Sequence, residues 1–301
     1  MPESLSLPNY GGQAVIEGVM MRGSQAVAIA MRAPNREIVL HTEALGSLYK
    51  SRIKQIPFLR GLVMLWDALG LGMRALTISA NTQTGEDEKL EGPALYLTLG
   101  VSLAFGIGLF FLAPALASLL TNQLLNWNPW WGNLAEGVIR LGLLIGYLLL
   151  IGRIEDIARV FAYHGAEHKT INAFEAGAAL TPESVGQFPL EHTRCGTSFL
   201  LTVVILSILL FSLLGPLPPF WHFASRLLML PLLAGVAYEY IRWTAAHLKN
   251  PVVRWLIKPN LALQRLTTRE PSPEMLEVAI AAFQEMRKSE LAKQFVENPV
   301  K

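Results

Sequence analysis

Two histidines and a glutamate stand close together in the segment Tyr163-His-Gly-Ala-Glu-His-Lys169. On a helix, His164 and His168 lie on one face, where their imidazoles are close enough to hold one metal ion. The spacing H-x-x-E-H is that of the inverzincins, in which the glutamate, here Glu167, is the general base for water. The chain has only six histidines among 301 residues, so this segment predicts a metal or catalytic site. The alternative is a polar helix face whose histidines hydrogen-bond their neighbours.

A second pair of possible ligands follows in His192-Thr-Arg-Cys195. A cysteine near a helix N-terminus and beside an arginine favours the thiolate, which binds metal and reacts. We expect His192 to be the third metal ligand and Cys195 to be a ligand or the neighbour of one. The alternative for Cys195 is a small buried side chain. Imidazoles and a possible thiolate favour zinc over magnesium or calcium, which prefer oxygen.

Four more polar residues could orient the ligands or lie beside them. Glu175 shares the helical face of the histidine pair, but an unbroken helix places it about 10.5 Å beyond the second histidine, too far to share one ion. Glu239 lies near the end of the last apolar segment, where it could reach the site or pair with Arg242. Gln13 and Glu17 stand in an apolar, glycine-rich block, so they need partners either at the histidines or within a small sheet.

The composition is that of an integral membrane protein. Mean hydropathy is +0.37, hydrophobic residues make up 52% of the chain and charged residues only 16%. A run of about 20 apolar residues crosses a hydrocarbon core of about 30 Å. Four segments meet this test and predict four transmembrane helices: residues 93–120, 134–152, 197–214 and 223–241.

The basic residues predict the orientation of these helices. Of the 25 Lys and Arg residues, 23 fall on one side of the predicted membrane and the other two lie within spans. The loops 121–133 and 215–222 carry none, and they contain Trp130 and Trp221, which suit the outer interface. Positive loops stay in the cytoplasm, so both termini and loop 153–195 are expected there, in a multi-pass protein of the plasma membrane. A single cysteine, which cannot form an internal disulfide, agrees with this placement.

Besides Glu239, three charged residues fall inside the predicted spans, where charges are costly. Glu136 and Arg140 are four residues apart on one helix, so we expect them to pair near the outer interface. Arg226 is expected to extend its long side chain toward the same interface. We assign structural roles to all three.

Residues 58–80 form a further apolar segment that we do not count as a span. It contains Arg60, Asp67 and Arg74, whose seven-residue spacing places them within about 40° of one another around a helix. If this segment crossed the membrane, every later loop would change sides and the basic loops would be external. We therefore predict an amphipathic helix in the cytoplasmic interface, with a re-entrant helix as the alternative.

The remaining segments predict a small cytoplasmic part. Runs 25–31 and 37–42 flank a turn-rich tetrapeptide and predict a β-hairpin, with a strand in the glycine-rich residues 11–18 before it. Ser272 followed by Pro273 predicts the start of a C-terminal helix. We expect one cooperative unit with three parts: a cytoplasmic N-terminal part (1–92), a membrane domain (93–242) and a cytoplasmic tail (243–301).

Four blocks of the sequence carry a family resemblance. They are Gly11-Gly-Gln-Ala-Val-Ile-Glu-Gly-Val-Met-Met-Arg-Gly23, Tyr163-His-Gly-Ala-Glu-His-Lys-Thr-Ile171, His192-Thr-Arg-Cys-Gly-Thr-Ser-Phe199 and Leu263-Gln-Arg-Leu-Thr-Thr-Arg-Glu-Pro271. In this order, and across nearly the whole chain, they resemble the YqhQ-like family of bacterial and plastid membrane proteins. The resemblance implies a metal-dependent enzyme, mainly because of the histidine-containing blocks, and it implies no substrate.

Two classes of function fit these observations. The first is a metal-dependent membrane enzyme, most simply a hydrolase at the cytoplasmic face with Glu167 as its base. The second is a non-enzymatic scaffold or assembly factor whose polar blocks bind a partner or fold the cytoplasmic part. A transporter ranks third, because it should show broken helices and facing polar residues at mid-membrane. The expected partner is the lipid bilayer and not nucleic acid; the sequence indicates no protein partner.

Overall fold

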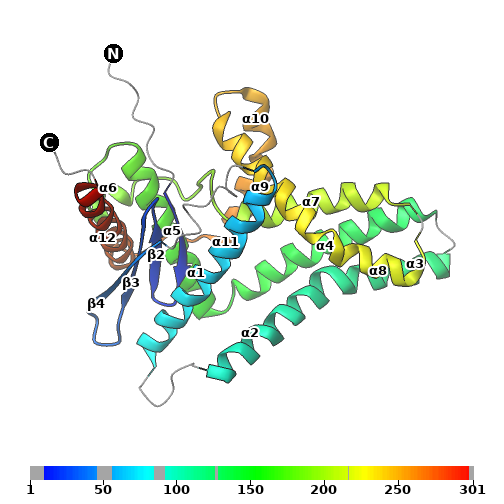
Figure 1. Cartoon of the computed structure of the whole chain (residues 1–301), viewed down its shortest axis with the longest axis horizontal. Coiled ribbons are helices and arrows are strands. Elements are labelled where there is room, and N and C mark those ends of the chain that lie inside the picture. The colour runs from blue at the N-terminus through cyan, green and yellow to red at the C-terminus, as the bar shows by residue number, and fades with distance from the viewer. Residues whose placement is uncertain (1–9, 46–55, 85–91, 126–127, 216, 298–301) are drawn as a thin grey trace.

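The computed structural model describes residues 10–45, 56–84, 92–125, 128–215 and 217–297. Within these ranges the chain is mostly helical, with one four-stranded sheet and four helices long and apolar enough to cross a membrane. Figure 1 shows the sheet and its covering helices gathered at one end, while the long apolar helices extend toward the other end. The predicted combination of a helical membrane protein with a small N-terminal sheet is therefore confirmed.

The sheet is an antiparallel meander in which each strand pairs with the next along the chain. Its strands are β1 (Gly11–Val15), β2 (Gly18–Arg22), β3 (Ala26–Arg32) and β4 (Ile38–Ala44). The predicted hairpin is confirmed as β3 and β4. The glycine-rich block, however, forms a second hairpin and not a single strand. The chain reverses at Glu17, which has a φ of 51° in the left-handed region.

Strands β2 and β3 are buried on both faces, which explains why their sequences are apolar without alternation. Val19 and Ala30 point to one side, where α5 (Glu155–Glu175) and α12 (Pro273–Glu297) cover the sheet. Met20 and Ile29 point to the other side, where they meet α1 (Leu59–Gln83). The sheet is thus the middle layer of three, and helices from distant parts of the chain form the outer layers.

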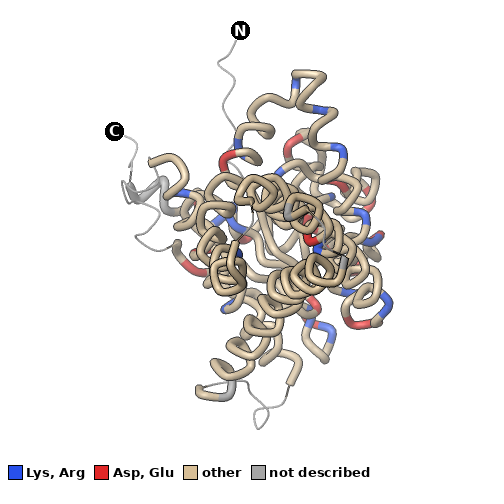
Figure 2. The backbone as a smooth tube through the Cα atoms, turned by 90° about the vertical axis from the view of Figure 1, so that its right-hand side faces the viewer, with Lys and Arg blue, Asp and Glu red and all other residues tan. Residues whose placement is uncertain are grey.

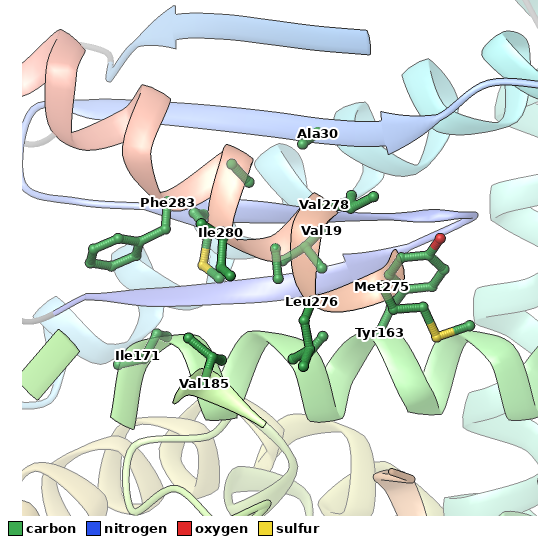
Figure 3. Close-up of a cluster of buried hydrophobic side chains, with 14 of the residues drawn as sticks. Val19, Ala30, Tyr163, Ile171, Val185, Met275, Leu276, Val278, Ile280 and Phe283 are labelled. Carbon is green, nitrogen blue, oxygen red and sulfur yellow. The ribbon is translucent and has the colours of Figure 1, made fainter. Parts of the chain in front are cut away.

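The predicted C-terminal helix is confirmed as α12, which begins at Pro273. Ser272 Oγ accepts a hydrogen bond from Met275 N at 3.4 Å, as expected of a residue before a helix N-terminus. Figure 3 shows Leu276, Ile280 and Phe283 of α12 directed into the space between the sheet and α5. The end of the chain therefore packs against its beginning, and α5 from the middle completes the same hydrophobic core.

Helix α1 lies across the sheet end of the long helices and does not run along them (Figure 1). Its first turns pack against α9 (Leu230–Ala246), where Gly61 meets Tyr238. Its later turns cover the sheet through Leu71, Ala75 and Ile78. By length and composition α1 is one of the four helices that could span a membrane, whereas its charged residues predict an amphipathic helix in the interface.

Three of the predicted spans correspond to long apolar helical segments, namely Leu95–Leu124, Trp130–Ile151 and Pro219–Ala246. They are built from α2 (Gly92–Ile107), the π-helical turn η4 (Gly108–Leu112), α3 (Ala113–Leu125), α4 (Pro129–Ile151), α8 (Pro219–Leu228) and α9. The fourth prediction matches α7 (Thr197–Leu213), which at 17 residues is shorter than the others. At about 1.5 Å per residue such a helix is about 25 Å long, and it packs against α4 and α9.

The far end of the bundle is poor in charge. Figure 2 looks onto this end and shows mostly uncharged tube in the central helices, with Lys, Arg, Asp and Glu positions mainly around them. Exposed aromatic side chains mark the same end, where Trp130 and Trp131 begin α4 and Trp221 lies in α8. Many large apolar side chains of the bundle are exposed, as lipid-facing residues would be.

A buried ion-pair network crosses this bundle. Glu136 of α4 accepts hydrogen bonds from Arg140 at 2.6 Å and from Arg226 at 2.7 Å. Asn133 also accepts from Arg226, at 2.8 Å, and Ser207 accepts from Arg140, at 2.9 Å. The predicted Glu136–Arg140 pair is confirmed. The side chain of Arg226 is 1% exposed and is paired with the buried carboxylate of Glu136, and its expected reach toward the outer interface stays a prediction.

Three short helices complete the fold: α6 (Pro182–Val185), α10 (Pro251–Leu256) and α11 (Lys258–Thr267). Helix α11 packs against α7, and its Leu263 joins the core of α4 and α7. The segment after α11 runs back beside α5, where Arg269 N donates to Phe161 O at 2.9 Å. The site residues of α5 are therefore enclosed between the sheet layer and the bundle.

Candidate metal centre

Helix α5 and the residues just before α7 bring three possible metal ligands together. His164 Nε2 lies 3.2 Å from Cys195 Sγ, and one ligand atom from each of His164, His168 and Cys195 lies within 4.8 Å of the other two. The two imidazoles share a helix face, as their spacing predicts, with ring centroids 4.4 Å apart. His168 is 0% exposed and Cys195 7%, whereas His164 is half-buried.

Backbone carbonyls fix the protonation of both imidazoles. His164 Nδ1 lies 2.9 Å from Thr267 O, and His168 Nδ1 lies 2.5 Å from Leu190 O. A carbonyl oxygen only accepts hydrogen bonds, so each Nδ1 carries the proton and each neutral imidazole keeps a lone pair on Nε2. Burial lowers the pKa of His168, and the neighbouring Cys195 opposes this shift. Both Nε2 atoms are therefore prepared to bind a cation on the side of Cys195.

The Nε2 atom of His168 is buried and has no hydrogen-bond partner in the part of the chain that the structure describes. Leaving a buried polar atom unpaired costs free energy, and such an atom needs an explanation. Cys195 Sγ accepts from Thr197 N at 3.4 Å and contacts Thr197 Oγ1 at 3.0 Å. The unpaired Nε2 of His168, the Nε2 of His164 and the sulfur of Cys195 form a donor set of the kind that binds zinc.

His192 lies beside this cluster. Its ring centroid is 5.6 Å from that of His168, and its Nε2 is buried without a hydrogen-bond partner among the described residues. Gln264 holds its backbone, accepting from His192 N at 3.0 Å and donating to His192 O at 2.8 Å. The structure thus brings His192 next to the pair, but the third donor atom within 4.8 Å is the sulfur of Cys195. The set of three histidines stays a prediction.

Glu167 is buried between α5 and β1. Gly12 N donates to its carboxyl group, and a Cβ atom at Gly12 would lie only 2.9 Å from Glu167 Cδ, so this strand position has room only for glycine. Burial raises the pKa of Glu167 to about 7, against the opposing effects of His164 and of the Gly12 amide. Its Oε2 atom has no hydrogen-bond partner in the described chain. Carboxyl groups with pKa values near 7 can act as general bases at physiological pH.

Glu175 lies at the edge of the site, as its position along α5 predicts. It forms an ion pair with Arg194, and its Oε2 is 3.9 Å from His192 Nε2. Burial raises the pKa of Glu175, but the contacts with His192 and Arg194 outweigh this effect, so the pKa is lowered. Glu175 is therefore placed to orient His192 and not to join the cluster of His164 and Cys195.

The other three predicted neighbours pair elsewhere. Glu17 binds Arg159 through two hydrogen bonds of 2.6 and 2.5 Å and accepts a longer one from Tyr163. Glu239 is paired with Arg60, a partner that neither of its two predicted alternatives, the site or Arg242, included. Gln13 packs against Gly72 of α1, where a Cβ atom would lie 2.2 Å from its Oε1. These residues join the sheet, α5, α1 and α9 to one another.

Three residues that support the site were not predicted. Gln264 and Thr267, both on α11, hold His192 and His164, and Leu190 O binds His168. The sequence offered two signals for α11. Gln264 is a polar residue that follows Leu263, and the block Leu263–Pro271 is one of the four that carry the family resemblance. Leu190 acts only through its backbone, so its side-chain type carries no signal.

These observations fit a protein of the multi-pass membrane class, with a largely buried histidine and cysteine cluster where the sheet layer meets the apolar helices. The chain belongs to the family described as "Protein of unknown function (DUF1385)", which it matches over residues 56–289. It is 36% identical over 300 residues to "Uncharacterized protein YqhQ" of Bacillus subtilis (strain 168), a match that covers 94% of this chain and 93% of the relative. No solved structure matches. The resemblance to the YqhQ-like family is confirmed.

Proposed function

We propose that this protein is a metal-dependent hydrolase whose ion is held by His164, His168 and Cys195. The observation that carries the proposal is the convergence of the three donor atoms within 4.8 Å, with both imidazoles already oriented by backbone carbonyls. Three protein ligands leave one position of a tetrahedral ion open, which is the pattern of catalytic and not of structural zinc. A bound zinc ion would supply Lewis-acid activation of water and of the substrate.

Glu167 has the role of the base in this proposal. It is buried next to His168, and one of its oxygens is unpaired among the described residues. In a hydrolysis the Glu167 carboxylate takes a proton from the attacking water and returns it to the leaving group, so the enzyme ends the cycle unchanged. Gly12, by donating its N–H to this carboxylate, keeps it in place during the transfer.

The site is proposed to face the cytoplasm, in a plasma-membrane protein with both termini inside. This orientation rests on the 23 of 25 basic residues that lie on one predicted side. It also agrees with a position of α1 at the cytoplasmic interface, because the later turns of this helix pack against the sheet and so are not available to face lipid. The metal centre then lies where the cytoplasmic layer meets the membrane.

Metal analysis tests the proposal directly. The purified protein should contain about one zinc ion per chain, since one three-ligand site binds one ion. His164→Ala should lose most of the metal. Glu167→Gln should keep it, because this change removes the base and leaves the donors intact, while any hydrolase activity falls. A folded wild-type protein that takes up no transition metal would instead favour a scaffold or assembly factor.

A further inference from the structure

A half-open cavity of about 590 Å³ adjoins the candidate metal centre. It is lined by the first half of α1, the last turns of α9, the beginning of α7 with the residues just before it, and the end of β2. Cys195 is part of its wall and also one of the three clustered donors. A molecule in this cavity would therefore lie directly against the proposed metal site.

The walls of the cavity have two chemical characters. Apolar side chains line much of it, among them Met64, Leu65, Phe199 and Ile241. Two of the helices that supply these residues, α1 and α9, are apolar enough to face lipid. A hydrocarbon chain that enters from the bilayer would therefore exchange one apolar surrounding for another, without desolvating polar groups.

The lining of the cavity also contains positively charged side chains. Arg22, Arg194 and Arg242 contribute guanidinium groups to the lining, and the described lining contains no Asp or Glu. Arginine presents planar, bidentate donors that match phosphate oxygens. The N-terminus of the 17-residue helix α7 opens at the same place, where Gly196 lines the wall, and helix N-termini favour anions.

Carboxylates outside the lining compensate this charge only in part. Asp67 lies 3.7 Å from Arg22, and Glu175 pairs with Arg194. Glu239 is near Arg242, but it is already paired with Arg60. Arg194 keeps one buried nitrogen, Nε, without a partner among the described residues. An anion in the cavity would therefore lie among three guanidinium groups, next to this buried nitrogen of Arg194.

We propose that this cavity binds a phosphate-bearing membrane lipid. The phosphate lies among Arg22, Arg194 and Arg242, next to Cys195, and the acyl chains follow the apolar walls toward the bilayer. Lipid binding stands on the cavity alone. The lipid's role as substrate rests on the proposed function: water oxygen bonds to phosphorus, the bond from phosphorus to the lipid alcohol breaks, and that alcohol oxygen takes the proton.

Native mass spectrometry of the full chain in detergent tests the binding. The probes are phosphatidic acid, diacylglycerol and glycerol 3-phosphate. Phosphatidic acid should bind at least about ten-fold more tightly than either of the others, because only it matches both the arginines and the apolar walls. Equal binding of diacylglycerol would overturn the phosphate assignment. Equal binding of glycerol 3-phosphate would overturn the assignment to a lipid.

Matched variants locate the binding. Arg242→Gln should weaken phosphatidic acid about ten-fold, the loss expected for one charge-assisted contact, whereas Arg254→Gln, an exposed arginine on α10, should not. Ala68→Trp should fill the cavity and block the lipid, whereas Leu69→Trp, the next and exposed position on α1, should leave binding unchanged. Unchanged binding in both cavity variants would place the lipid elsewhere and reject the proposal.

Metal content, measured on the same samples, separates this inference from the proposed function. Ala68→Trp should retain the wild-type metal content, because residue 68 is not one of the three donors. If the wild-type protein binds phosphatidic acid in this cavity but no metal, the lipid site holds and the hydrolase fails. If it binds metal but no phosphatidic acid, the hydrolase keeps its support and the lipid proposal fails.

Discussion

His164 and Cys195 are separated by 31 positions in the chain, yet the Nε2 atom of one lies 3.2 Å from the Sγ atom of the other. This contact joins α5, which belongs to the sheet layer, to the start of α7 in the apolar bundle. Neither the sheet layer nor the bundle alone holds all three donors. The candidate metal centre therefore exists only when both parts are assembled.

The identity of the third ligand can be decided by two substitutions. Cys195→Ala should reduce bound zinc about ten-fold or more, because it removes a donor that lies within 4.8 Å of both imidazole nitrogens. His192→Ala should reduce it less, because its ring stands beside the cluster. Elemental analysis of the folded variants measures both. A greater loss in His192→Ala would restore the set of three histidines that the sequence predicts.

Gly165 is a sensitive position next to the two histidines. A Cβ atom there would lie 2.2 Å from Arg269 O and 2.8 Å from Leu190 Cδ2, and both segments carry the backbone that orients the site. Gly165→Ala should therefore destabilise the protein by about 1–3 kcal/mol, as overpacking does, and should weaken metal binding. Gly146→Ala is the control, since nothing lies within 4 Å of its Cβ position. Thermal unfolding in detergent compares the two, and equal Tm values would contradict the close packing.

Much of the fold follows from local patterns. The apolar runs predict the long helices, and the Ser272-Pro273 pair predicts the start of α12. The glycine-rich hairpin β1–β2 was not predicted, because its turn uses Glu17 in a left-handed conformation that non-glycine residues seldom adopt. The partner of Arg226 was also not predicted, since it is a carboxylate 90 residues away.

The candidate site is predictable to a smaller extent. The spacing of His164 and His168 places both imidazoles on one helix face, and this needs only the helical period. The choice between His192 and Cys195 depends on how the loop before α7 approaches α5, which no local pattern contains. Gln264 contributes through a long-range contact to a backbone group, and such contacts leave little trace in one sequence.

The pair of Glu17 and Arg159 should make stability depend on acid. The Arg159 hydrogen bonds lower the pKa of Glu17 below its ordinary value of 4.5. The stabilisation that the ionised Glu17 gives to the folded protein is therefore present above pH 4.5, and it is lost as the pH falls through the lower pKa that Glu17 has in the folded state. Because both side chains are partly exposed, the effect should be at most about 1 kcal/mol. Glu17→Gln should be less stable than wild type at pH 7 and equal to it in strong acid, in unfolding curves measured at both pH values. A constant difference would contradict this assignment.

Glu136 should be among the most sensitive residues of the bundle. Replacing it by Gln leaves Arg140 and Arg226 buried without their counter-charge, which should cost about 3–5 kcal/mol. Glu239→Gln is a matched control, because its pair with Arg60 is partly exposed and should contribute at most about 1 kcal/mol. The drop in Tm in detergent should be several times larger for Glu136→Gln. Similar losses would show that the buried network contributes little to stability.

The orientation of the chain can be tested by labelling from outside intact cells. A cysteine at Asn128, just before α4, should react with a membrane-impermeant maleimide, because residues 121–133 carry no Lys or Arg and α4 begins at the end of the apolar helices away from the sheet. A cysteine at Glu183, an exposed position on α6 beside the sheet layer, should react only after the membrane is opened. Both variants are made with Cys195→Ser, so that each carries one thiol. The reverse pattern would place the metal centre outside the cell and would overturn the proposed orientation.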